Sequence, residues 1–411
     1  MLGLVSTVKQ AHRSSKTLTN ASKPATFIEF LLLDALLNRG RHHTLRVVCD
    51  KLIAQKQLIA YYFLAKSQLL CHQIDDGLNT IEHFLSHYPH HIDALYLKAN
   101  LLIQAGNQAQ AKSLLHDVLT HSKRGKTWQL LAHLVESESD FIHYRKMMME
   151  HHDLSTISYD LACHLTDASY RGNHVDWIYA WWQDKYAQHQ RGISWHTPNQ
   201  STKPFGKKSF NHHRATHALM AFKRMMDKHN IDFFLIGGTL LGCVREGKLL
   251  GHDKDIDVGV FDSTNHHDLE NVCRQSGVFY VLPSATSDQI LVIRHLNGTT
   301  IDIFFHTHAD DKIYHGGGKC LWYNSYFELS PYHFLGTDYL IPKDYELYLC
   351  EHYGDDWRIP KVSFDSALDT PNMQIVDVKK YEIYLYKKFF ATNHPRYITK
   401  LNDIHQSRQQ R

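Results

Sequence analysis

Three aspartates stand at alternate positions at the start of an apolar run, where a strand would carry them side by side. Successive side chains of a strand point to opposite faces, so we expect Asp253, Asp255 and Asp257 on one side and Ile256 and Val258 on the other. Neighbouring carboxylates repel one another, which is costly unless a cation neutralises them. Oxygen ligands suit Mg²⁺ or Mn²⁺ better than zinc. The pattern therefore predicts a carboxylate site for a divalent cation.

A glycine turn precedes these aspartates. Gly237 and Gly238 follow an apolar segment, 232–236, and Thr239 opens a short helix-forming stretch. Consecutive glycines let backbone N–H groups approach an anion closely, and the helix N-terminus would point to the same place. A phosphate cradle beside a carboxylate metal site favours chemistry on a metal-bound nucleotide or another diphosphate.

A fourth aspartate, Asp302, lies 45 residues after Asp257. It belongs to the second of two β-rich runs, 289–296 and 299–305, which Asn297-Gly298 separates. An Asn-Gly pair between such runs is a strong hairpin signal. Asp302 alternates with isoleucines, so it would face away from the apolar side and complete a carboxylate triad if its strand lies beside the first.

The elements that must position these residues make up about half of the chain. The length, 411 residues, predicts two or three domains. A formal net charge of +3 gives no indication of a nucleic-acid partner. Seven scattered cysteines without a Cys-x-x-Cys pair favour a reduced, cytosolic setting and no structural zinc. No run reaches the 18 or so apolar residues that a membrane span needs.

The N-terminal part has a helical pattern with a period of 34 residues. Ala65 and Ala99 correspond, as do Gly77 and Ala111, and such small residues suit closely crossing helices, while Pro89 would end a helix. This pattern resembles the tetratricopeptide repeat, which would offer a surface for a protein partner. An unrelated helical bundle is the alternative.

These patterns divide the chain as follows. We expect a flexible N-terminus (1–25), helical repeats (26–135), a helical connector and linker (136–205), a catalytic domain (206–400) and a loose tail (401–411). The tryptophans between positions 177 and 195 of the connector are expected to form a docking surface between the two halves rather than a ligand cage.

Several motifs in their order resemble the LicD/fukutin-related family, phosphotransferases of the nucleotidyltransferase-like superfamily. They are Gly-Gly-Thr-Leu-Leu-Gly at 237–242, Arg245, the alternating aspartates, Ile-Asp-Ile-Phe around Asp302, and Tyr-Gly-Asp-Asp-Trp at 353–357 with Pro360. The resemblance covers residues 214–372. It implies an α+β protein in which an all-α helical-repeat part precedes a small mixed β-sheet flanked by helices.

The resemblance also implies an activity. It is the transfer of a phospho-alcohol group (phosphocholine, ribitol phosphate or similar) from a CDP-activated donor to a glycan of capsule, lipopolysaccharide or teichoic type, with release of CMP. We expect a cytoplasmic protein, at most peripheral at the inner face of the membrane. By residue, Asp255 and Asp257 would hold Mg²⁺ or Mn²⁺. Asp302 would be the third carboxylate, which would share the metal or take the proton of the acceptor hydroxyl. Asp253 would border the substrate, Gly237, Gly238 and Thr239 would face the donor phosphates, and Arg245 would offer a fork to phosphate.

Two other functions fit parts of the pattern. An Asp-x-Asp motif also marks metal-dependent glycosyltransferases that use nucleotide sugars, although the Gly-Gly-Thr turn and Asp302 argue against this class. A non-catalytic scaffold, in which the repeats bind a partner and the second domain is vestigial, is the other alternative, and the intact carboxylates argue against it.

Overall fold

The computed structural model describes residues 25–193, 195, 211–251, 253, 255–283, 287–361 and 364–409. These residues form two compact units. The first contains the chain up to Thr127 together with residues 267–281 and 293–299, and the second contains the remainder. The expected flexible N-terminus, up to residue 24, and the end of the expected connector and linker, 196–205, lie outside the described residues.

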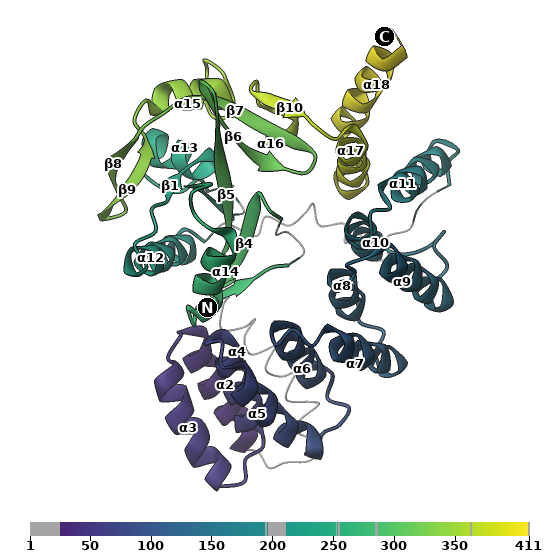
Figure 1. The fold of residues 1–411 in the computed structure, drawn as a ribbon, viewed down its shortest axis with the longest axis vertical. Coiled ribbons are helices and arrows are strands. Elements are labelled where there is room, and N and C mark those ends of the chain that lie inside the picture. Colours follow the sequence, from purple (N-terminus) through teal and green to yellow (C-terminus); the bar gives the residue numbers. More distant parts are fainter. Residues whose placement is uncertain are drawn as a thin grey trace. The chain divides into compact units, whose positions relative to one another are not determined.

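The N-terminal helices of the first unit follow one another with short turns (Figure 1). They are α2 (Ala25–Asn38), α3 (His42–Ala54), α4 (Ile59–Leu70), α5 (Ile74–His87), α6 (Ile92–Gln104) and α7 (Gln108–His121). Ala65, Ala99 and Ala111 are fully buried. A Cβ on Gly77 would lie 2.6 Å from Leu101 Cδ2. The small residues therefore stand where helices pack closely, and α5 ends before Pro89; the tetratricopeptide assignment itself stays a prediction.

The first unit also contains α14 (His266–Gln275), β3 (Phe279–Val281) and the second half of β4 (Ile290–His295). The link between α14 and β3 contacts the helices directly. Gly277 N–H donates to Leu70 O at 3.1 Å, and His42 Nε2 lies 2.5 Å from Gly277 O. A Cβ on Gly40 would lie 2.9 Å from Val278 Cγ1. Helices near the N-terminus are thus completed by a segment more than 200 residues further along the chain.

The second unit contains helices from both sides of the sheet region in sequence. They are α8 (Gly125–His133), α9 (Glu138–His151), α10 (Tyr159–Arg171), α11 (Val175–Gln190), α17 (Val378–Thr392) and α18 (Arg396–Gln409). Trp182 is fully buried and its indole N–H donates to Thr166 Oγ1. The ring centroid of Phe390 lies 5.9 Å from that of Trp182 and 5.0 Å from that of Trp195. The tryptophans therefore pack the connector helices against α17.

The C-terminal residues correct one expectation. A loose tail from residue 401 was expected from its polar composition, but α18 continues to Gln409. Leu401 is buried, and Arg408 Nη1 lies 3.2 Å from Glu382 Oε1, a fully buried carboxylate on α17. Arg408 on α18 is a partner for the buried charge of Glu382, and this pairing stabilises the helix at the C-terminal end.

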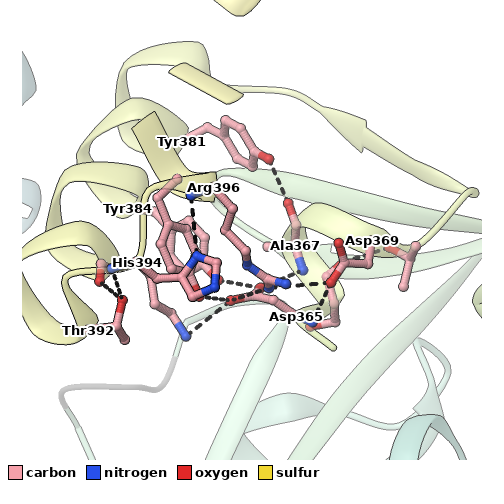
Figure 2. Close-up of polar contacts among 12 residues, drawn as sticks. Asp365, Ala367, Asp369, Tyr381, Tyr384, Thr392, His394 and Arg396 are labelled. Carbon is pink, nitrogen blue, oxygen red and sulfur yellow. Dashed lines mark hydrogen bonds and ion pairs between the residues drawn. The ribbon is translucent and has the colours of Figure 1, made fainter. Parts of the chain in front are cut away.

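A polar cluster around Asp365 joins α16 (Ser366–Asp369) to the two C-terminal helices (Figure 2). The Asp365 carboxylate accepts from the hydroxyls of Tyr384 at 2.5 Å and Tyr397 at 3.1 Å. Lys388 Nζ lies 3.4 Å from it. Burial alone would raise the pKa of Asp365, but Lys388 and the two hydroxyls outweigh burial and hold that pKa below its usual range.

The sheet of the second unit is mixed. In the described part of the chain its strands follow the order β10-β7-β6-β5-β2-β1-β9-β8. Strands β3 and β4 lie off this path and belong wholly or partly to the first unit. The strands are β1 (Phe234–Leu235), β2 (Asp255–Phe261), β5 (Thr300–Ala309), β6 (Lys312–Gly317), β7 (Cys320–Ser325), β8 (Leu329–Phe334), β9 (Thr337–Pro342) and β10 (Met373–Ile375). Pairs β2–β5 and β1–β9 are parallel. With α12 (His212–Lys228), α13 (Gly237–Glu246) and α15 (Tyr345–Tyr353) as flanking helices, the expected α+β class is confirmed.

Three buried histidines lie between this sheet and α15. His306 is on β5, His315 on β6 and His352 on α15, and each is at most 5% exposed. The rings of His306 and His315 stack with centroids 4.3 Å apart, and His315 and His352 stack at 6.4 Å. Burial lowers the pKa of His306 to about 3 and that of His352 to about 4, and burial followed by the other two imidazoles lowers the pKa of His315 well below its usual value.

Among the described helices, none is both long enough and apolar enough to cross a membrane.

Candidate active site

Two parallel strands bring the distant aspartates together. On β2 and β5, Asp257 is paired in register with Asp302, and Asp255 with Thr300. Neighbouring strands lie about 4.8 Å apart and paired residues share a face, so Asp257 and Asp302 are neighbours on one side of the sheet. The Asn297-Gly298 turn precedes β5 as expected: Gly298 has φ +92° and its N–H donates to His295 O at 2.8 Å.

The carboxylates destabilise one another's charge. Burial, then the charges of Asp255, Asp253 and Asp302, raises the pKa of Asp257 well above its usual value, and the Gly238 N–H opposes the shift. Burial, then Asp255 and Asp253, raises the pKa of Asp302 to about 7. Such mutual shifts are typical of functional carboxylate clusters.

The carboxylates lie so close to both glycines of the turn that any larger residue at either position would collide with them. Helix α13 begins at Gly237, whose φ is +52° and whose Cβ, if present, would lie 2.9 Å from Asp257 Oδ2. A Cβ on Gly238 would lie 2.2 Å from Asp253 Oδ2. The Gly238 N–H points at Asp257 Oδ2 at 3.3 Å. The helix N-terminus thus faces the acidic cluster, and Asp253 lies at the glycine turn, just before β2 begins.

Thr239 has a contact that the sequence pattern did not indicate. Its side chain is 1% exposed, and its hydroxyl accepts the backbone N–H of Asp257 at 2.8 Å. This bond ties the start of α13 to the strand that carries the carboxylates. The expected contact of Thr239, Gly237 and Gly238 with donor phosphates stays a prediction.

Arg245 lies at the other end of α13, with its side chain 10% exposed. One terminal nitrogen donates to Trp357 O at 3.2 Å and the other to Glu246 Oε1 at 3.0 Å. Its Nε is buried without a hydrogen-bond partner. The guanidinium is therefore positioned by the Tyr-Gly-Asp-Asp-Trp segment, and its expected contact with donor phosphate stays a prediction.

Two tyrosines of α15 were missed by sequence reasoning. Burial, then Asp257 and Glu351, raises the pKa of Tyr348, and burial, then Asp257 and Asp253, raises the pKa of Tyr353. The Tyr348 hydroxyl is buried without a hydrogen-bond partner. The only signal was the closing Tyr-Gly-Asp-Asp-Trp motif, which includes Tyr353 but assigns it no role.

The fit of a divalent cation can be judged from the carboxylates themselves. Within the described residues, no group of three or more His, Cys, Asp or Glu side chains has the spacing of a metal site. Asp302 Oδ1, however, is buried without a hydrogen-bond partner, and each carboxylate raises the pKa of a neighbour. An orphaned carboxylate oxygen among like charges suits a cation, and Mg²⁺ often takes only one or two protein carboxylates plus substrate phosphates.

Part of the sheet region is similar to a known protein family. Residues 230–344 match the family model described as "LicD/FKTN/FKRP, nucleotidyltransferase domain". These residues form a LicD domain. The domain contains the glycine turn and all four aspartates, whereas Tyr348 and Tyr353 follow it in the sequence.

Relatives of the LicD domain include "Ribitol-5-phosphate transferase FKTN" from Mus musculus, 24% identical over 169 residues, which are 39% of this chain and 37% of that protein. The Homo sapiens protein of the same name is 23% identical over 168 residues, 39% of this chain and 36% of its own length. The match thus spans little more than a third of these curated relatives. The structure of ANT(2″)-Ia in complex with adenylyl-2″-tobramycin aligns with a TM-score of 0.23 at 13% identity, over 47% of this chain and 98% of that one.

Proposed function

We propose that the LicD domain is a metal-dependent phosphotransferase that moves a phospho-alcohol group from a CDP-activated donor to a glycan hydroxyl and releases CMP. The observation that carries this proposal is the in-register pairing of Asp257 with Asp302 opposite the glycine-rich start of α13. It puts acidic groups for a cation and backbone donors for phosphate at one place. Ribitol phosphate is the first alcohol to test, because the named relatives are ribitol-5-phosphate transferases.

The residues would divide the work as follows. Asp255 and Asp257 would hold Mg²⁺ or Mn²⁺, which when bound neutralises phosphate charge. The acceptor hydroxyl attacks the donor phosphorus that carries the alcohol, an O–P bond forms, and the bond to CMP breaks with its electron pair leaving on CMP. Asp302 takes the hydroxyl proton, and a pKa near 7 suits a general base at neutral pH. Arg245 Nε and the Gly237–Gly238 backbone would bind donor phosphate.

The test is release of CMP from a panel of CDP-ribitol, CDP-choline and CDP-glycerol, with Mg²⁺ or with EDTA. We expect one donor to be used, only with the divalent cation. Asp257→Asn should reduce the rate at least about 100-fold while circular dichroism stays unchanged, because a ligand charge is lost. Asp310→Asn is the matched control, since Asp310 is exposed on the β5–β6 turn with φ +52°, which asparagine tolerates.

Hydrolysis of a UDP-sugar panel in place of the CDP-alcohols would contradict the proposal and favour a nucleotide-sugar glycosyltransferase. Full activity in EDTA would contradict the metal dependence alone. The class of glycan, a location at the inner face of a membrane and a protein partner for the helical repeats stay predictions.

A further inference from the structure

A cleft of about 270 Å³ opens in the second unit, at the ends of β2 and β5 away from the carboxylates. Its lining includes Asp262, Asn265, Asp288, Gln289, Phe305 and Tyr314. None of the four aspartates of the candidate active site lines it.

The cleft and the carboxylate cluster are separate places on the sheet. Thr307 lines the cleft and is five residues after Asp302 on β5. An odd separation puts the two side chains on opposite faces, and at about 3.3 Å per residue they lie roughly 17 Å apart along the strand. Asp262 likewise follows Asp257 by five residues and lies just past the end of β2 at Phe261.

The lining combines hydrogen-bonding groups with aromatic surface. The carboxylates of Asp262 and Asp288 accept hydrogen bonds, and the amides of Asn265 and Gln289 both donate and accept. Phe305 and Tyr314 come from adjacent strands. His266 closes one wall: its ring stacks on Phe305 with centroids 4.8 Å apart, and its Nε2 lies 3.0 Å from Ser287 O. The wall is therefore fixed before a ligand arrives.

This chemistry selects among ligand classes. In the described part of the chain no lysine or arginine lines the cleft, and two carboxylates would repel an anion. The many polar groups disfavour a purely apolar ligand. A neutral saccharide presents hydroxyls that both donate and accept, and C–H faces that pack on aromatic rings. The volume lies just below the range of about 300–1,000 Å³ for drug-sized ligands, which leaves room for about one or two sugar rings.

We propose that this cleft binds a neutral sugar unit of the glycan acceptor at a distance from the reacting hydroxyl. The identity of the ligand as the acceptor rests on the proposed function. Binding at a second place raises the effective concentration of the chain near the carboxylates, so long glycans would be better acceptors than short ones.

The experiment is binding of the full chain, without donor, to an immobilised array of neutral and acidic oligosaccharides. We expect at least one neutral oligosaccharide to bind, with affinity unchanged in Asp255→Asn and reduced at least about tenfold in Tyr314→Ala and in Asp288→Asn. Tyr314→Phe should keep binding, which separates loss of the ring from misfolding. Tyr326→Ala is the matched control, because Tyr326 is 57% exposed and does not line the cleft.

The proposal is overturned if no neutral oligosaccharide binds, if Tyr314→Ala binds as well as the unaltered protein, or if Asp255→Asn abolishes binding. A parallel measurement of CMP release from CDP-ribitol in the presence of short glycan acceptors in solution reports on the proposed function alone, because this reaction needs the carboxylates and an acceptor hydroxyl but not the cleft. Glycan binding without CMP release from any donor would support the saccharide cleft and contradict the phosphotransferase activity. CMP release without glycan binding to the array would support the phosphotransferase activity and contradict the saccharide cleft.

Discussion

Asp302 is buried among like charges, with one carboxylate oxygen lacking a hydrogen-bond partner. Without a cation, this arrangement opposes folding above the usual aspartate pKa, because the folded state holds the proton up to about pH 7 while the unfolded chain releases it near pH 4. Stability from this group is therefore present at low pH and lost as the pH rises towards 7.

We predict that Asp302→Asn raises the unfolding temperature in EDTA at pH 8 by a few degrees, because the repulsion is removed. The same substitution should reduce kcat at least about 100-fold with little change in KM for the donor, because a base acts mainly in the transition state. Differential scanning calorimetry and CMP release give the two measurements. A lower unfolding temperature in EDTA would show that Asp302 has a structural partner, and Asp310→Asn should change neither quantity.

At this scale the sequence predicted that Asp257 and Asp302 are neighbours, but it did not predict the contacts that hold them. The alternation of aspartates and the Asn-Gly turn were enough to expect Asp302 beside Asp257, because a slipped register would bury the carboxylate among apolar side chains. The bond from Asp257 N–H to Thr239 and the proximity of Tyr353 to the carboxylates depend on tertiary packing, which no local pattern encodes.

Among the elements, β5, β6 and α15 share the buried histidines His306, His315 and His352. Each has a folded-state pKa below the unfolded value near 6.5. Their contribution to stability is therefore complete above pH 6.5 and is lost as the pH falls, since only the unfolded chain takes up the protons.

We predict that the free energy of unfolding falls between pH 6.5 and 5 by about 1.4 kcal/mol per pH unit for each of these histidines. Urea unfolding at several pH values measures the slope. His315→Phe, which retains a ring but cannot titrate, should reduce the slope by the amount for one proton. An unchanged slope in this variant would mean that His315 is protonated in the folded protein.

The cluster around Asp365 fixes α16 against α17 and α18 through a nearly buried carboxylate. We predict that Asp365→Asn lowers the free energy of unfolding by about 1.5–3 kcal/mol, because the hydroxyls of Tyr384 and Tyr397 lose a charged acceptor. Asp369→Asn is the control: its side chain is 37% exposed and pairs with Arg396 at 3.3 Å, so its loss should cost less than about 1 kcal/mol. Equal losses, measured by denaturant titration, would contradict the importance of Asp365.

Elements with strong local signals were predicted, and those held by distant partners were not. The N-terminal helices and the hairpin at Asn297-Gly298 have clear periodicity or turn chemistry. Helix α18 is too polar for such a signal, and its partners Glu382 and Asp365 precede it in the sequence by up to about 30 residues.

At the scale of the whole chain, Gly277 contacts the N-terminal helices across more than 200 residues of sequence. We predict that Gly277→Ala destabilises the protein more than Gly106→Ala does. Both glycines have positive φ, +73° and +77°, so the backbone strain is matched at about 1–2 kcal/mol. At Gly277 a Cβ would lie 3.1 Å from His42 Nε2, whereas at Gly106 no atom lies within 4 Å. Equal unfolding temperatures for the two variants would show that the His42 contact does not contribute.

The domain boundaries drawn from the sequence treated the chain as consecutive blocks. Composition and period change near residue 136 and again near 205, and these are local signals. The contact between His42 and Gly277, which are 235 residues apart, has no local signal. Neither a histidine nor a glycine is unusual in the sequence around it.

The first unit is assembled from segments that lie far apart in the sequence, and this affects folding during synthesis. The ribosome completes the N-terminal helices when residue 127 has emerged, but their last partner, residue 299, emerges 172 residues later. At about 5–20 residues per second this interval is roughly 9–34 s. During it the surface that receives Gly277 and Val278 faces solvent or a chaperone, so the nascent chain, rather than the finished protein, is the form most exposed to aggregation.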